Sequence, residues 1–298
     1  MSNTKVLLTG ATGYVGGSIL NVVIHTASGY HTRCAKALIF GLARRKEKTG
    51  KEVHYIHTTG TSNTANSPYL DLYPEKPSGI FSDKDPARFF STLKVLDSVV
   101  PYPQRTTDLA VLQTGLDTGV KTYIIMSPDI YGKGTGDFNT MTIQVPSLIR
   151  SSLKLGYVWM ISNGTGIWNH VHIKDLVQLY EIILEKLLAQ HHLPSGEEGI
   201  YFSENGEHTW AEVAEGIAKA GFELGVLTTK EVRSVTLMEA TKLLGWGNEQ
   251  WTESGFASIA RTLSERSHSL GWKPLWSKDD FISHYYAEWE EVLKGSRV

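Results

Sequence analysis

The chain has 298 residues, of which 41% are hydrophobic and 20% are charged, and its 29 basic and 31 acidic side chains leave a net charge of −2. These values are ordinary for a globular protein that forms one large domain or two modest ones. The near-neutral charge offers no basic surface for nucleic acid, and no apolar run reaches the 18 residues of a membrane span. We therefore expect neither nucleic acid nor a membrane as a partner.

The cellular compartment is suggested by two further features. Cys34 is the only cysteine, so no disulfide can form within the chain. The first ten residues have neither the apolar run nor the small-residue cleavage site of a secretory signal. We expect a cytoplasmic protein.

A glycine-rich turn follows the first apolar run, which spans residues 6–9. Such a turn between a strand and a helix lets the backbone approach a pyrophosphate, and the free amides of the new helix then hold the phosphate charge. The alternative is a glycine turn with no role in binding. However, the turn directly follows a buried strand, which is the position that the dinucleotide fingerprint requires. The residues that we expect to contact a dinucleotide here are Gly10, Thr12, Gly13, Tyr14, Val15 and Gly16.

The spacing of these glycines resembles that of the short-chain dehydrogenase/reductase superfamily, in particular its extended branch of nucleotide-sugar epimerases, dehydratases and reductases. Later segments are similar to the family in the same order: 22–28 to its fourth strand, 53–61 to its fifth, 123–132 to its sixth, and 164–176 and 270–274 to C-terminal segments. The resemblance implies NAD or NADP as cofactor and a small-molecule substrate, and it allows a homodimer. It also implies that Thr26 and Ala27 pass under the cofactor and that Pro128 lines the nicotinamide.

Apolar runs and helical stretches alternate through the first half of the chain, which predicts a parallel sheet covered by helices. The expected strands are 6–9, 22–26, 53–57 and 122–126, and the expected helices are 31–48 and 105–119. The stretch 60–86 is rich in Thr, Ser, Asn, Pro and Gly and predicts a long loop, which would lie at the cofactor mouth and could cover a substrate.

The second half predicts helices at 143–155, 174–189 and 210–224. We expect an α/β fold, with a shortened Rossmann-like parallel sheet and a smaller C-terminal α+β substrate domain. The expected domains are 1–135, which binds NAD(P), and 136–298, which binds the substrate and is partly interleaved with the first.

The first crossover is unusually short, because only twelve positions separate Gly10 from Val22. In the family that the chain resembles, a second strand, a helix and a third strand lie in this interval. The sequence is best interpreted as lacking them, so that strand 22–28 corresponds to the family's fourth. The alternative is that 22–28 is a true second strand. No Asp or Glu lies at the position expected to grip the ribose, so NAD and NADP cannot be distinguished.

The family's catalytic Tyr-x-x-x-Lys is absent, and Tyr102 followed by Arg105 is the nearest equivalent. The resemblance implies that Tyr102 donates a proton and that Arg105 orients ribose, although arginine does not replace lysine conservatively. A merely packed aromatic is the alternative for Tyr102. Thr58, Thr59 and Thr61 are candidate hydroxyl partners, or strand-end caps, and we select Thr59.

Other constellations point to less specific roles. His170 and His172 lie two apart on an expected strand, but no third ligand is suggested, so we expect no metal. Trp246 and Trp251 either line a substrate pocket or pack, and packing is the preferred interpretation. Taken together, the sequence favours an NAD(P)-dependent oxidoreductase or epimerase acting on a carbonyl or secondary alcohol. A non-catalytic dinucleotide sensor and a variant impaired in cofactor binding are the alternatives.

Overall fold

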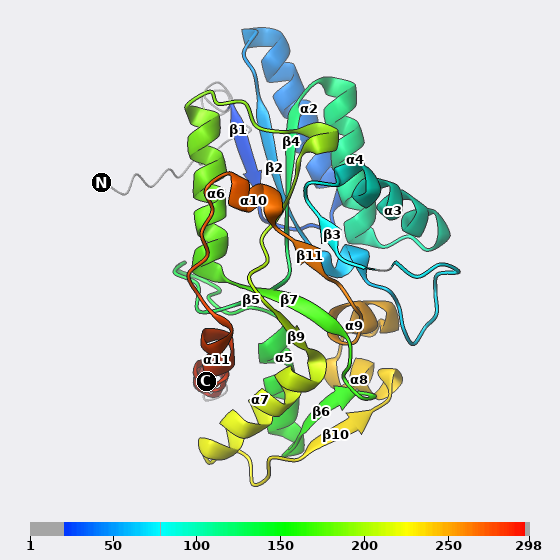
Figure 1. Cartoon of the computed structure of the whole chain (residues 1–298), viewed down its shortest axis with the longest axis vertical. Helices are drawn as coiled ribbons and strands as arrows, with labels where there is room; N and C mark the ends of the chain where they lie inside the picture. Colours follow the sequence, from blue (N-terminus) through cyan, green and yellow to red (C-terminus); the bar gives the residue numbers. More distant parts are fainter. Residues whose placement is uncertain (1–20, 78, 296–298) are drawn as a thin grey trace.

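The computed structural model describes residues 21–77 and 79–295, so the expected strand 6–9 and the glycine turn at 10–16 lie outside the described residues. Four parallel strands form the main sheet in the order β1-β2-β4-β8 (Figure 1). They are β1 (Val22–His25), β2 (His54–Gly60), β4 (Lys121–Ser127) and β8 (Ile200–Phe202). The expected α/β fold with a parallel sheet is confirmed.

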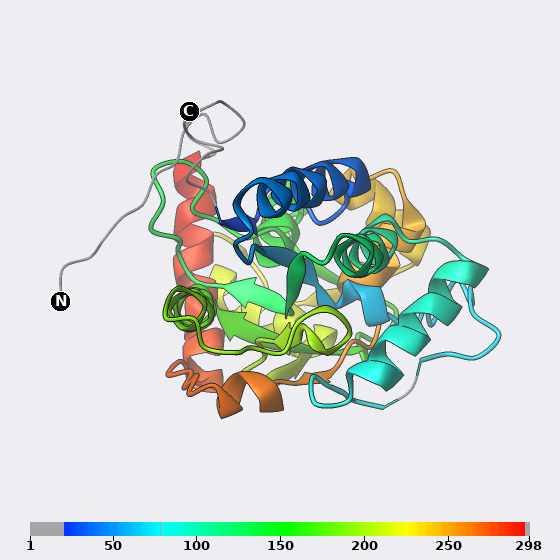
Figure 2. The same cartoon turned by 90° about the horizontal axis from the view of Figure 1, so that it is seen from above.

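Both faces of this sheet are covered by helices. The helices are α2 (Thr32–Thr49), α3 (Pro86–Val99), α4 (Pro103–Thr118) and α6 (Ile173–Leu188). Tyr55 and Ile124 belong to the cluster that packs under α2, α3 and α4, whereas their neighbours Ile56 and Ile125 pack against α6. Figure 2 shows α2 and α4 on one side of the sheet and α6 on the other. Strands β1, β2 and β4 correspond to the expected strands 22–26, 53–57 and 122–126, whereas β8 was not predicted.

Strand β1 lies beside β2, with Val22 opposite His54 and His25 opposite His57. In the family's strand order the fourth strand pairs with the fifth, whereas a true second strand would pair with the first and third. The position of β1 therefore agrees with the interpretation that the second and third strands are missing.

The five predicted helices are present, with ends within two residues of those expected; besides α2, α4 and α6 they are α5 (Gln144–Leu155) and α7 (Trp210–Glu223). Helix α3 was not predicted, although its start carries a signal: Pro86 occupies the first turn, and the Asp85 side chain accepts a hydrogen bond from the Arg88 amide. The predicted loop 60–86 contains a short 3-10 helix, η1 (Thr61–Thr64), and the strand β3 (Phe81–Ser82).

A second apolar core lies beside the sheet and is built mainly by α5, α7 and the C-terminal helix. Two small sheets border it, with orders β10-β6 and β5-β7-β9. The strands are β5 (Asp129–Tyr131), β6 (Val158–Ile161), β7 (Ile167–His172), β9 (Glu207–Thr209) and β10 (Val232–Val235). The remaining helices are η2 (Gly196–Glu198), α8 (Leu237–Leu244), α9 (Glu249–Phe256), α10 (Glu265–Ser269) and α11 (Lys278–Gly295).

The chain passes between the two parts more than once. Helix α6 and strand β8 follow residue 136 in sequence but pack with the main sheet. Strand β11 (Thr262–Leu263) pairs with β3, which lies more than 170 positions earlier. The division at 135/136 stays a prediction. None of the helices in the described residues is both long and apolar enough to cross a membrane.

A buried carboxylate on α9 ties the two parts together. Glu253 is fully buried, and it accepts hydrogen bonds from Ser67 Oγ at 2.6 Å, from the Leu70 amide at 2.9 Å and from the Tyr69 amide. These three donors lie on the segment that follows η1. The carboxylate therefore fixes this segment against α9.

Replacing Glu253 by Gln is expected to lower the free energy of unfolding by about 2 kcal/mol, because an amide offers only one acceptor oxygen and turns an NH2 group toward buried donors. Denaturant unfolding measures the effect, with the exposed Glu181→Gln on α6 as the matched control. Equal stability of the two variants would show that the segment after η1 does not depend on this carboxylate.

Candidate active site

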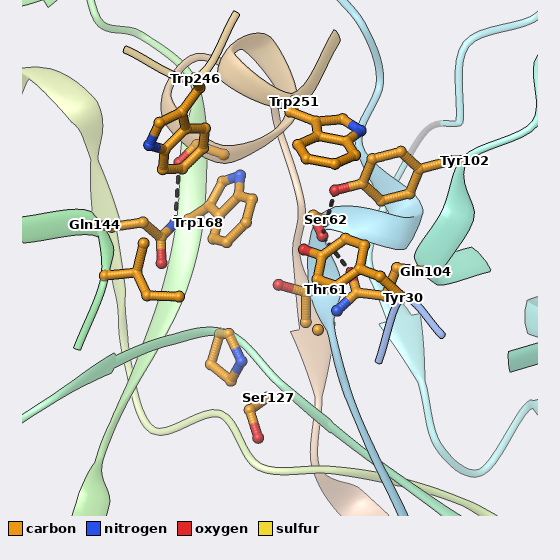
Figure 3. Close-up of a pocket in the computed structure, with 14 residues that line it drawn as sticks. Tyr30, Thr61, Ser62, Tyr102, Gln104, Ser127, Gln144, Trp168, Trp246 and Trp251 are labelled. Atoms are coloured by element: carbon orange, nitrogen blue, oxygen red, sulfur yellow. Dashed lines mark hydrogen bonds between the residues drawn. The ribbon is translucent and has the colours of Figure 1, made fainter. Parts of the chain in front are cut away.

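A cavity of about 450 Å³ lies at the carboxyl ends of β2 and β4, where the main sheet meets the second part (Figure 3). Ligands of open α/β sheets bind at this edge. One wall comes from the strand ends and α4, the other from residues of α5, β7 and the α8–α9 region. The residues that line the cavity are Tyr30, Gly60, Thr61, Ser62, Tyr102, Gln104, Ser127, Pro128, Ile143, Gln144, Trp168, Trp246, Trp251 and Gly255.

Three polar side chains of the first wall form a chain of hydrogen bonds. Tyr102 immediately precedes α4, and its hydroxyl donates to Ser62 Oγ at 3.3 Å. Ser62 in turn donates to Gln104 Oε1 at 2.7 Å. Because Gln104 takes the hydrogen of Ser62, the lone pairs of Ser62 remain available to the phenol. All three residues line the cavity (Figure 3).

The Tyr102 phenol is held in its neutral form. Burial raises the pKa of Tyr102 well above its ordinary value, and the neighbouring Tyr30 adds to this, while Ser62 and Arg105 act in the opposite direction. The guanidinium carbon of Arg105 lies 5.8 Å from the centre of the Tyr102 ring. At neutral pH Tyr102 therefore carries its proton.

Two glycines allow Gln104 to reach this position. A Cβ at Gly29 would lie 3.3 Å from Gln104 Nε2, and one at Gly60 would lie 3.2 Å from the same atom. Both distances are tighter than ordinary contact, so the amide of Gln104 sits between two backbone segments that carry no side chain at that point. The close approach fixes the acceptor that orients Ser62.

Thr59 does not line the cavity. Its hydroxyl donates to Asp108 Oδ2 at 3.0 Å, and the same oxygen accepts from Asn63 Nδ2 at 2.5 Å. His57 Nε2 lies 3.4 Å from the other oxygen of Asp108. All four side chains are buried, and burial raises the pKa of Asp108. The network lies behind η1 and thereby supports Ser62.

Arg105 is also buried and does not line the cavity. Its Nε donates to the carbonyl oxygen of Asn63 at 2.9 Å, and its terminal nitrogens donate to the Tyr73 hydroxyl at 3.1 Å and to the Val100 carbonyl oxygen at 3.5 Å. All three of these acceptors are groups of the protein itself, and none is a group that a ligand would supply. The guanidinium therefore fixes the end of η1 and the loop behind it.

The remaining predicted residues fall into three groups. Pro128 lies at the end of β4 and lines the cavity with Tyr102, so the structure brings these two together. Thr26 and Ala27 follow β1 and are exposed. The expected phosphate-binding residues Gly10, Thr12, Gly13, Tyr14, Val15 and Gly16 lie outside the described residues.

Sequence reasoning missed Ser62 and Gln104. Ser62 follows the segment that resembles the family's fifth strand, and Gln104 stands between Tyr102 and Arg105. The available signal was the spacing of Tyr102 and Arg105, which is shorter than that of the family's Tyr-x-x-x-Lys. It places a further polar residue, Gln104, at the start of the same helix.

The other wall is aromatic, and here the preference for packing alone was wrong. Trp246 lies against Phe256 with 5.0 Å between ring centres, but it also lines the cavity, as does Trp251. Trp251 lies 5.8 Å from the ring of Tyr30, which lies 6.2 Å from that of Tyr102. The aromatic wall thus continues to the polar chain.

The two histidines of β7 have separate aromatic partners. His170 stacks on Phe281 with 4.0 Å between ring centres, and His172 stacks on Trp276 with 3.8 Å. Among the described residues, no group of three or more His, Cys, Asp or Glu side chains has the arrangement of a metal site.

The comparisons with known proteins agree with the fold. Residues 80–193 match the model of the NAD dependent epimerase/dehydratase family. "Oxidase ucsJ" of Acremonium sp is 27% identical over 270 residues, which cover 86% of this chain and 73% of that protein.

Solved structures share the fold at low sequence identity. UDP-glucuronic acid 4-epimerase of Bacillus cereus, in a complex with NAD, has a TM-score of 0.56 at 14% identity and covers 92% of this chain and 77% of its own. dTDP-glucose 4,6-dehydratase of Bacillus anthracis, also with NAD, has a TM-score of 0.57 at 12% identity, covering 91% and 73%. RMD of Pseudomonas aeruginosa, complexed with NADPH, has a TM-score of 0.52 at 14% identity, covering 93% and 82%.

The sheet order, the matched family model and these relatives agree with one another and with the sequence motifs. Over residues 80–193 the chain is similar to the NAD dependent epimerase/dehydratase family, and its fold is similar to that of epimerases and dehydratases solved with NAD.

Proposed function

We propose that this chain binds NAD or NADP and transfers hydride at a carbonyl or secondary alcohol of a small molecule, with Tyr102 as the proton donor and acceptor. The observation that carries the proposal is the chain from Tyr102 through Ser62 to Gln104, which faces the cavity at the carboxyl ends of β2 and β4. A catalytic acid must lie within hydrogen-bond reach of the reacting oxygen, and this cavity offers such a place.

The described residues fit the nicotinamide end of the cofactor. Gly60, Ser127 and Pro128 form a small, uncharged floor at the two strand ends, and the backbone after β1 is exposed beside it. Gly10, Gly13 and Gly16 are the residues that we propose for the diphosphate. When bound, the nicotinamide would supply or accept the hydride.

The roles of the chain's own residues follow from their contacts. In carbonyl reduction Tyr102, neutral at physiological pH, would give its proton to the substrate oxygen and become a phenolate; in the reverse direction that phenolate would take the proton of the alcohol. Ser62 would hold the phenol in place, and Gln104 would fix the hydroxyl of Ser62. We propose positioning roles for Thr59 and Arg105, because both act on η1 from behind.

A dinucleotide sensor without turnover is the second candidate, and one observation favours it. Among the described residues that line the cavity there is no lysine or arginine, so no fixed charge next to Tyr102 faces a ligand. In the resembling family that charge belongs to lysine, which assists the tyrosine. A cytoplasmic location and a homodimer stay predictions.

Thermal unfolding with and without NAD and NADP tests the cofactor. At 100 times the dissociation constant, a bound dinucleotide is expected to add about 2.7 kcal/mol to the free energy of unfolding. Binding combined with oxidation or reduction of carbonyl compounds would support the enzyme, and binding without any turnover would support the sensor. No shift with either dinucleotide would contradict both and would indicate an impaired variant.

A further inference from the structure

The cavity has an uneven distribution of polar and apolar groups. Among the described residues that line it, none is charged, and none is histidine. Its wall from the second part consists largely of Trp168, Trp246, Trp251 and Ile143 (Figure 3). The wall from the sheet and α4 carries hydroxyl groups instead.

Two polar side chains of the apolar wall, Trp168 and Gln144, already donate hydrogen bonds within the protein. Trp168 Nε1 donates to Ser258 Oγ at 3.0 Å, so this side chain presents its ring to the cavity and not its donor. Gln144 Nε2 donates to the carbonyl oxygen of Gly255 at 2.9 Å. A ligand would therefore meet mainly ring surface on this side, which favours apolar and planar or ring-shaped molecules.

The polar wall leaves one hydroxyl free. Thr61 Oγ1 is buried and has no hydrogen-bond partner among the described residues. Thr61 lines the cavity next to Ser62, and the phenol of Tyr102 donates its hydrogen bond to Ser62. A buried polar atom without a partner is costly, and a ligand oxygen at this end would satisfy it.

The uncharged lining formed by the described residues disfavours the nucleotide-sugar substrates of the structural neighbours. The Bacillus cereus epimerase was solved with a UDP-sugar derivative, whose diphosphate needs cationic or backbone donors when it is desolvated. Arg105, which follows the cavity residue Gln104 but does not line the cavity, is buried with its donors on Asn63, Tyr73 and Val100.

Size supports the same conclusion. A volume of about 450 Å³ lies toward the lower end of the ~300–1,000 Å³ that ligand pockets usually span, and the nicotinamide would occupy part of it. The space that remains suits a compact ring system better than a nucleotide joined to a sugar.

We infer that the substrate is an uncharged, largely apolar ring compound with a ketone or secondary alcohol, and not a nucleotide sugar. Its oxygen would lie at the end formed by Thr61, Ser62 and Tyr102, and its ring body would lie against Trp168, Trp246 and Trp251. This inference rests on the proposed function, since it assigns the substrate of the same cavity.

Calorimetric titration of the full chain with 1-decalone, a saturated bicyclic ketone, and with UDP-glucose tests the inference, both with and without NADP. We expect saturable binding of 1-decalone and none of UDP-glucose. Trp251→Ala is expected to weaken ketone binding about tenfold, and Trp251→Phe to restore most of it, because an aromatic face is what the site requires. Trp251 is partly exposed on α9, so its truncation leaves the core intact.

The matched control is Leu275→Ala, which removes an exposed apolar side chain that does not line the cavity and is expected to leave ketone affinity unchanged. The inference would be overturned if UDP-glucose bound more tightly than 1-decalone, or if Trp251→Ala left the affinity for 1-decalone unchanged. A separate titration with NAD and with NADP tests the proposed function, which would be overturned if neither dinucleotide bound; the ketone titration without dinucleotide still decides the substrate class.

Discussion

Replacing Tyr102 by Phe is expected to slow turnover at least 100-fold while leaving dinucleotide affinity unchanged. The change removes one hydroxyl group, which donates to Ser62 at 3.3 Å and is the group proposed to exchange a proton with the substrate. A positioned general acid contributes roughly 10²- to 10⁴-fold to a rate. The ring remains, so its contacts with Tyr30 and Arg105 persist and the fold is preserved.

The measurement compares kcat/KM for a ketone substrate with dinucleotide binding to the same preparation. Tyr157→Phe is the matched control, because it removes a phenol hydroxyl next to Arg233, far from the polar chain of the cavity. Wild-type turnover by the Tyr102→Phe enzyme would show that the Tyr102 hydroxyl takes no part in the reaction. Loss of dinucleotide binding in parallel with turnover would instead show that the phenol holds the cofactor.

Much of the fold could be predicted because it follows from local periodicity. In α6 the apolar residues Leu176, Leu179, Ile183 and Leu187 recur at spacings of three and four, and all four are buried against the sheet. Strand β4 is largely apolar on both faces, as buried parallel strands are, and in β2 the neighbours Tyr55 and Ile56 pack on opposite faces. These signals lie within a single window of sequence.

The site depended on features without such a local signal. Side chains alternate along β2, but η1 begins at Thr61, and this change of backbone conformation decides that Ser62 reaches Tyr102 while Thr59 turns toward Asp108. The tryptophans of the apolar wall come from β7 and the α8–α9 region, far along the chain from the strand ends. One sequence cannot show which distant segments meet at the sheet edge.

A second prediction concerns a buried carboxyl group that neither the sequence nor the proposed chemistry accounts for. Asp129 directly follows the cavity residue Pro128, is fully buried on β5, and has no hydrogen-bond partner for either oxygen among the described residues. Burial, and to a lesser degree Glu288, raises the pKa of Asp129 from 3.8 to about 8. Asp129 is therefore protonated in the native state at neutral pH.

The surrounding groups leave this proton in place. His208 Nε2 lies 4.0 Å from Asp129, and burial lowers the pKa of His208 well below its ordinary value. Burial likewise lowers the pKa of His170, which stacks on His208, to about 4. Both imidazoles are consequently neutral between pH 5 and 7, and neither supplies a cation that would ionise Asp129.

Linkage then fixes the direction of the pH dependence. Between pH 5 and 7 the native state keeps the Asp129 proton and the unfolded state releases it, so rising pH lowers the stability by up to ~1.4 kcal/mol per unit from this group. Asp129→Asn has nearly the same shape and no such proton. Relative to wild type, the variant is therefore expected to gain about 3 kcal/mol between pH 5 and 7, with little difference near pH 4 and no further gain above pH 8.

Denaturant unfolding at pH 4, 5, 6, 7 and 8 measures this difference in the free energy of unfolding. The contributions of the histidines cancel in the difference, because both proteins carry them. Asp137→Asn, at an exposed position, is expected to run parallel to wild type at every pH. A parallel curve for Asp129→Asn as well would mean that Asp129 is ionised in the native state and is paired by His208. Because Asp129 adjoins Pro128, such an ion pair would place charge next to a cavity whose described lining has none.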